Sequence, residues 1–164
     1  HRHALLTALA CVALGRHSGQ SEADCVQLAA IGLFHDLGLL HADDAVADGE
    51  PALTPAQRDQ QAAHAAVSAA LLRRHPVYAG AVADAVAAHH ERLDGSGFPQ
   101  HLHGEAVGAW ARIVALAELL TTLDSGVGIL DALRVSNLLR LQSGAFDDAL
   151  VAAVLAACDD TERG

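Results

Sequence analysis

The sequence lacks two residue types altogether and is poor in a third. It contains no lysine and no methionine, and aromatic residues make up only 3% of its 164 residues. The sequence contains ten arginines and twenty acidic residues, so the formal net charge is −10 with neutral histidines. A protein that binds a nucleic-acid polymer needs clustered cations to neutralise phosphates, and this acidic chain argues against such a partner.

The shortage of aromatic residues also argues against a β-rich fold. Apolar residues make up 52% of the chain, and most of them are alanine, leucine and valine in segments with helical spacing. A β-sandwich would contain more aromatic and β-branched residues. The length indicates a single domain over residues 1–164, large enough to bury a core. We therefore expect an all-α fold, a bundle of about six to seven helices.

Long hydrophobic runs and paired cysteines are missing too. No apolar run reaches the roughly 18 residues that a membrane span needs, and no signal peptide stands at the start. Cys11, Cys25 and Cys158 are odd in number and lie in apolar segments, which favours reduced core thiols in a cytoplasmic protein without membrane insertion. The sequence opens inside a helical pattern without a cap, so we expect a domain cut from a longer chain with a preceding sensor or receiver domain.

Helical patterns alternate with turn-forming residues along the chain. Ser21 is a typical N-cap, and Thr54-Pro55-Ala56-Gln57 combines a capping box with proline at the first helical position. We expect an acidic loop over 41–53, a loop rich in glycine and histidine over 94–106, and a solvated tail over 159–162. The expected helices cover about residues 1–16, 21–38, 54–74, 79–88, 108–123, 129–142 and 146–157.

Eleven histidines are an unusual number for an acidic chain, and their placement indicates a metal site. Taken singly, each histidine also fits a buried hydrogen-bonded side chain or a surface residue. Polar groups on the inner faces of apolar helices need a partner, however, and imidazoles and carboxylates are natural ligands of Fe, Mn, Zn or Ni. The candidate metal ligands recur on five expected helices and are His3, His35, Asp36, His64, His89, His90 and Glu118.

One stretch is especially specific. Residues 88–99 read Ala-His-His-Glu-Arg-Leu-Asp-Gly-Ser-Gly-Phe-Pro, so a histidine pair stands directly before a glycine-rich turn. Together with the doublet His35-Asp36 and the following Gly38, this stretch resembles the HD-GYP domain, a branch of the HD phosphohydrolase superfamily. The resemblance runs from His3 to about Ser125 and also includes Leu53-Thr54, His64, Gly104 and the segment 111–114.

The resemblance implies a metal-dependent phosphodiesterase that hydrolyses cyclic di-GMP to the linear dinucleotide or to GMP, with a cyclic dinucleotide as the bound substrate. It implies two divalent transition-metal ions, Fe or Mn in the first place and Ni or Zn as alternatives, which activate a water between them. Asp36 would bridge the two ions. The other ligands would be His3, His35 and Glu118 for one ion, and His64, His89 and His90 for the other.

The resemblance also suggests residues that act on the substrate. The residues expected in catalysis are Asp36, His35, His89 and His90, and those expected to contact the substrate are Arg92, Phe98 and Arg112. Two of these have a simpler alternative. Arg92 equally fits a surface salt bridge to Glu91 or Asp94, and Phe98 equally fits packing under the glycines of its own loop.

The sequence departs from the family pattern at five places. Leu39 stands where the family has lysine after HD-x-G, and Val127 falls where it has an arginine-proline-tyrosine stretch. Ala65 replaces a proline, Phe98 replaces the tyrosine of the GYP motif, and Glu118 replaces an aspartate of the metal site. Two cations near the substrate phosphate are therefore missing.

These departures leave three hypotheses about function. The first is an active cyclic di-GMP phosphodiesterase, and the second is a catalytically degenerate module that acts in binding or signalling. The third is an HD hydrolase for another nucleotide substrate. A signalling-protein partner or a homodimer fits each of them.

Overall fold

The computed structural model is an α-helical domain and describes residues 2–47, 51–124 and 132–163. No β-strand occurs within these ranges, so the all-α prediction is confirmed. The elements are α1 (Arg2–His17), α2 (Glu22–Phe34), the 3₁₀ helix η1 (Leu37–His41), α3 (Asp44–Ala47), α4 (Pro55–Leu72), α5 (Ala81–Ala87), the 3₁₀ helix η2 (Gly104–Ala106), α6 (Ala109–Asp124), α7 (Ala132–Leu141) and α8 (Asp148–Arg163).

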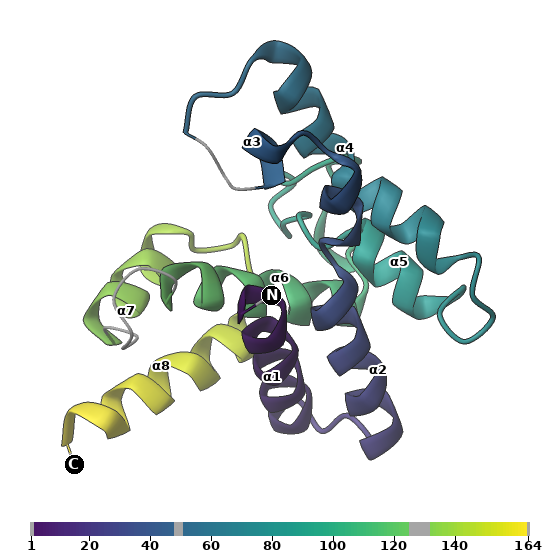
Figure 1. The fold of residues 1–164 in the computed structure, drawn as a ribbon. Helices are drawn as coiled ribbons and strands as arrows, with labels where there is room; N and C mark the ends of the chain where they lie inside the picture. Colours follow the sequence, from purple (N-terminus) through teal and green to yellow (C-terminus); the bar gives the residue numbers. More distant parts are fainter. Residues whose placement is uncertain (1, 48–50, 125–131, 164) are drawn as a thin grey trace.

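The helices pack around α6. Helices α1 and α2 lie side by side, α6 crosses α1, and α4 pairs with α5, while α7 packs against α8 on the opposite side (Figure 1). Leu28 and Ile31 of α2, Val86 of α5 and Val114 and Leu116 of α6 are almost fully buried and join one core. This core fixes the ends of α2 and α5, from which the histidine motifs extend.

The predicted caps and thiols are present. The Ser21 hydroxyl accepts a hydrogen bond from the Asp24 amide (3.1 Å) at the start of α2. Thr54 and Gln57 form the capping box that starts α4, with Pro55 in the first turn. Cys11, Cys25 and Cys158 are not joined in a disulfide, and burial followed by the charge of Glu118 raises the pKa of Cys11 to about 12.

Two predicted details are wrong. The loop predicted over 41–53 contains α3, which is too short to give a periodic pattern but buries Val46. The tail predicted over 159–162 continues α8 to Arg163, because neither glycine nor proline ends the helix before Gly164.

The segment 22–41, which includes α2 and η1, is long and apolar enough to cross a membrane by length and composition. Buried core helices pass the same test, and this segment carries Leu28 and Ile31 into the core. Val127 lies outside the described residues.

Glycine allows the closest contact between α1 and α2. A Cβ on Gly32 would lie 2.5 Å from the Cα atom of Ala8, so the two helix backbones pack directly on each other. We expect Gly32→Ala to lower the free energy of unfolding by about 2 kcal/mol or more, because the backbones must separate. Gly108→Ala is the matched control, since nothing lies within 4 Å of its added Cβ. Equal denaturant midpoints for the two variants would contradict this account of the packing.

Candidate metal centre

The His35-Asp36 doublet lies where α2 gives way to η1. Helix α2 ends at Phe34, and the His35 amide still donates to the Ile31 carbonyl (2.9 Å). His35 is fully buried, whereas Asp36 is partly open to solvent. The position at a helix end lets the two adjacent side chains face the same region between α1 and α4.

Three histidines make the same local hydrogen bond. Nδ1 of His35, His64 and His89 each contacts the carbonyl three residues earlier, that of Gly32 (2.9 Å), Gln61 and Val86 (2.6 Å) respectively. A neutral imidazole has one N–H, so donation from Nδ1 leaves Nε2 of each ring as a bare lone pair. Such second bonds orient metal-binding histidines in proteins generally.

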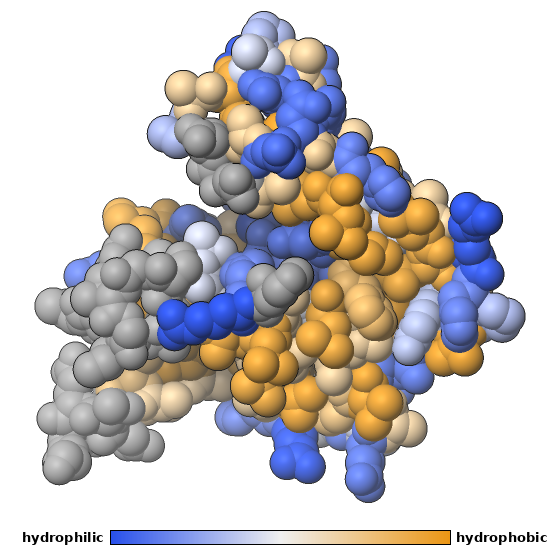
Figure 2. All heavy atoms as spheres, viewed as in Figure 1, coloured by the Kyte–Doolittle hydropathy of each residue, from blue (hydrophilic) through white to orange (hydrophobic). Residues whose placement is uncertain are grey.

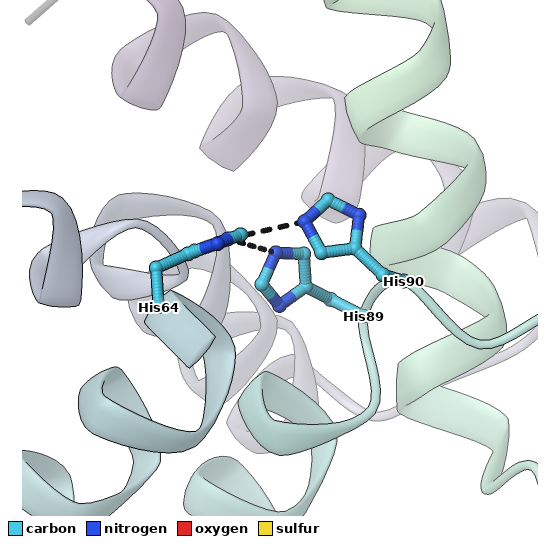
Figure 3. Close-up of side chains that lie close together, drawn as sticks. All are labelled: His64, His89 and His90. Atoms are coloured by element: carbon cyan, nitrogen blue, oxygen red, sulfur yellow. Dashed lines mark hydrogen bonds between the residues drawn. The ribbon is translucent and has the colours of Figure 1, made fainter. Parts of the chain in front are cut away.

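The Nε2 atoms of His64 and His89 converge with that of His90. Nε2 of His64 lies 3.3 Å from Nε2 of His89 and 3.1 Å from Nε2 of His90, with His64 on α4 and the pair on the turn after α5 (Figure 3). Two imidazole nitrogens at these distances repel each other unless a proton or a metal ion lies between them. Two nitrogens held about 2.1 Å from one ion are about 3.0 Å apart at a right angle and about 3.4 Å apart at a tetrahedral angle. The observed spacing therefore fits three ligands of one ion.

Asp36 lies between this histidine trio and a second group of ligands. Its Oδ1 lies 3.3 Å from Nε2 of His64 and 4.0 Å from Nε2 of His89. Its Oδ2 lies 3.1 Å from Nε2 of His35 and 4.0 Å from Nε2 of His3. His3, His35 and Asp36 form one group of possible ligands and His64, His89 and His90 form the other. One carboxylate thus presents a separate oxygen to each group.

Glu118 reaches the site from α6. Its Oε2 lies 3.5 Å from Nδ1 of His90 and is buried without a hydrogen-bond partner. Nε2 of His35 is buried without one as well, because its contact with Asp36 lacks hydrogen-bond geometry. Unpaired buried polar atoms are costly, and a metal ion is a partner that both atom types accept. The predicted grouping placed Glu118 with His3 and His35, whereas the structure brings it beside His90.

The pKa shifts show where the site favours positive charge. Burial lowers the pKa of His35 and His64, but the carboxylate of Asp36 beside both rings outweighs burial, and the net shift of both is upward. Burial and the neighbouring imidazoles lower the pKa of His89 strongly and that of His90 to about 3. Burial raises the pKa of Glu118 to about 7. The cluster therefore attracts positive charge near Asp36 and keeps the histidine pair in the neutral, metal-binding form.

Gly38 sets the distance between the doublet and His64. A Cβ on Gly38 would lie 2.3 Å from the His64 carbonyl oxygen, and the Gly38 amide donates to the Ser68 hydroxyl (2.7 Å). Only glycine allows η1 to pack this tightly on α4. The Gly38 of the HD-x-G pattern therefore has a direct physical role at the metal centre.

The loop after the histidine pair is anchored by Glu91. The buried carboxylate of Glu91 accepts hydrogen bonds from the amides of Gln100 (2.7 Å) and Leu102 (2.9 Å). The loop backbone packs against this anchor, because a Cβ on Gly97 would lie 2.5 Å from the Glu91 Cα. The Phe98 ring stacks on the His90 ring at a centroid distance of 4.5 Å. Sequence reasoning missed the anchoring role of Glu91, although its place in the motif was a signal.

A cavity of about 1140 Å³ opens onto these ligands. Figure 2 shows hydrophilic atoms gathered in the hollow between the α3–α4 end of the molecule and α1. Phe98 and Leu39 line the cavity, and so do five of the seven candidate ligands: His3, Asp36, His64, His90 and Glu118. The volume is slightly above the usual range of about 300–1,000 Å³ for small-ligand pockets.

Two predicted substrate-contacting residues lie elsewhere among the described residues. The Arg92 guanidinium lies 4.8 Å from the centre of the Phe146 ring and donates to the carbonyls of His89 and Glu91. Arg112 donates to the carbonyls of Val107 (2.8 Å) and Gly104 (3.2 Å), which holds the η2 loop on α6. Neither arginine lines the cavity described above, whereas Phe98 does.

The comparisons with known proteins identify the family of the chain. The family described as "HD domain" matches residues 1–147, so the chain belongs to the HD domain family. A solved structure of Bd1817, titled an HDG"Y"P protein from Bdellovibrio bacteriovorus, aligns with a TM-score of 0.77 over 99% of this chain and 52% of that one, at 19% identity. That likeness establishes the fold, and the resemblance to HD-GYP domains is confirmed.

Two curated relatives are named as phosphodiesterases. The 3'3'-cGAMP-specific phosphodiesterase 3 of Vibrio cholerae is 30% identical over 112 residues, which cover 68% of this chain and 24% of the relative. The cyclic di-GMP phosphodiesterase response regulator RpfG of Xanthomonas campestris is 33% identical over 109 residues, 65% of this chain and 28% of the relative. The chain thus spans about a quarter of the length of these relatives.

Proposed function

We propose that this domain is a metal-dependent phosphodiesterase that hydrolyses a cyclic dinucleotide, with cyclic di-GMP as the first candidate. The observation that carries the proposal is the position of Asp36. Its two oxygens each face a separate group of imidazoles, which is the arrangement that a carboxylate bridging two ions requires. The names of the relatives supply the substrate class.

Two divalent ions fit the residues present. In this scheme His3 and His35 hold one ion, His64, His89 and His90 hold the other, and Asp36 joins them. Glu118 completes the set beside His90. Ions held there supply an activated water and neutralise charge on the phosphodiester. Fe or Mn suits imidazole and carboxylate ligands best, with Ni or Zn as alternatives.

The chain itself orients and encloses the substrate. The Nδ1 hydrogen bonds of His35, His64 and His89 hold their rings so that each Nε2 points into the centre. Phe98, fixed on the ring of His90, offers an aromatic face to a base at the cavity wall. The 1140 Å³ volume accommodates a ligand larger than a mononucleotide.

A catalytically degenerate binding module is the second candidate, and Leu39 favours it. Leu39 lines the cavity at the place where a lysine was expected from the resemblance. A cytoplasmic location, supported by three cysteines that form no disulfide, is part of the main proposal. The signalling-protein partner or homodimer stays a prediction.

Turnover and binding of a cyclic dinucleotide panel, measured in parallel on the metal-loaded protein, test the proposal. We expect slow, metal-dependent hydrolysis of cyclic di-GMP, because each missing phosphate contact lowers the rate by about 10²–10³-fold. Leu39→Lys should raise kcat/KM by about tenfold or more. If the protein binds the ligand but shows no turnover, and Leu39→Lys restores none, the degenerate binding module is the correct function.

A further inference from the structure

More acidic than basic side chains line the cavity beside the metal centre. Three acidic residues line it, Asp36, Asp44 and Glu118, and among the described lining residues Arg58 is the one arginine. A cyclic dinucleotide has two phosphodiesters in one ring, and only one of them is attacked at a time. The metal centre therefore accounts for one phosphate, and the second phosphate needs another cation.

Arg58 lies on the same helix as His64 and faces the same cavity. Both residues line it together with Gln61 and Ala62, which lie between them on α4. Arg58 and His64 are six positions apart, which corresponds to about 9 Å along the helix axis. The Arg58 guanidinium is bonded to the Leu53 carbonyl at the start of α4, on the side away from His64, which suits a group at the far side of a ring-shaped ligand.

One hydrogen bond holds the Arg58 guanidinium in place, and its other donor groups can bind a ligand. Its Nη1 donates to the Leu53 carbonyl (2.6 Å), which holds the guanidinium at the start of α4. Its Nε and Nη2 make no hydrogen bond to the described part of the chain. A planar guanidinium with two free donor groups matches a phosphate in a bidentate manner.

We propose that Arg58 binds the second phosphate of the cyclic dinucleotide, the one that is not at the metal centre. This inference rests on the proposed function and adds a specificity residue to it. Arg58 then distinguishes a cyclic dinucleotide from a substrate with a single phosphate. A phosphodiester that lacks the second phosphate gains nothing from this contact.

Steady-state kinetics of Arg58→Gln on two substrates test the inference. We expect KM for cyclic di-GMP to rise about tenfold, as loss of one charge-assisted contact predicts. KM for bis(p-nitrophenyl) phosphate, which has one phosphate, should change less than twofold. Arg58→Lys should restore part of the affinity, since lysine keeps the positive charge but lacks the two parallel donors of a guanidinium. Arg74→Gln removes the same charge from an exposed position that does not line the cavity, and serves as the control.

Two results would overturn the assignment. Unchanged KM values for both substrates would show that Arg58 makes no contact, and equal rises for both would place its effect on the metal centre or the fold. If the wild-type protein hydrolyses neither phosphodiester, the proposed enzymatic function fails. The Kd for cyclic di-GMP, measured by calorimetry, then tests whether Arg58 contacts the ligand. A tenfold weaker Kd for Arg58→Gln alone supports the contact, whereas an equal Kd, or no binding by the wild type, contradicts it.

Discussion

Asp36→Ala is expected to abolish phosphodiesterase activity and to release bound metal. Asp36 is the one carboxylate that presents an oxygen to both ligand groups among the described residues. Its loss removes the bridge and leaves the imidazoles without the anion that attracts cations. A contribution of about 4 kcal/mol to transition-state stabilisation corresponds to roughly a 10³-fold loss in rate. We expect at least this loss in kcat/KM and less than one bound ion per chain by elemental analysis.

Two further variants test whether the effect comes from the charge of Asp36. Asp36→Asn preserves the shape of the side chain and should lose activity to a similar extent, since the amide lacks the charge. Asp59→Ala removes a carboxylate from an exposed position on α4 outside the cavity and is expected to retain activity and metal. Metal content and rates near the wild-type values in Asp36→Ala would contradict the bridging role.

Glu91→Ala is expected to destabilise the domain and to lower its activity together. The buried carboxylate holds the loop through the amides of Gln100 and Leu102. A hydrogen bond to a charged group contributes about 1.5–3 kcal/mol, so losing two should lower the free energy of unfolding by about 3 kcal/mol. For a domain of this size that corresponds to a fall in Tm of about 6–12 °C. The loop also holds Phe98 on His90, so KM for the substrate should rise.

Glu105→Ala provides the comparison for this effect. The Glu105 side chain is 97% exposed and contacts only Arg112 within the described structure, so its removal should change stability by less than about 0.5 kcal/mol. Thermal unfolding followed by circular dichroism measures both variants. A Tm for Glu91→Ala within 2 °C of that for Glu105→Ala would show that Glu91 does not anchor the loop.

The candidate ligands that the structure brings together as the sequence predicted are those encoded in local motifs. The doublet His35-Asp36 and the pair His89-His90 each occupy adjacent positions, so their side chains were certain to start close together. The all-α class followed from composition and helical spacing. The glycine of HD-x-G also had a local signature, although its reason, the contact between Gly38 and the His64 carbonyl, became clear only in the fold.

The parts that the sequence did not predict depend on contacts between distant segments. Arg112 pairs with Asp147 and with the carbonyl of Gly104, and no periodic pattern indicates which surface a long side chain will reach. The same holds for Arg92, which lies over Phe146. The contact of Glu118 with His90 depends on the angle between helices, which no local pattern encodes. The four-residue α3 is shorter than any window that reveals helical spacing.

The most direct test of the central claim is a metal titration of activity. The protein is stripped with a chelator and then titrated with Mn²⁺ or Fe²⁺ while the hydrolysis of cyclic di-GMP and the number of bound ions are measured in the same samples. The account predicts no hydrolysis in the stripped protein and a rate that rises until about two ions are bound per chain. Hydrolysis that is unchanged by chelation, or binding of less than half an ion per chain at saturation, would contradict it.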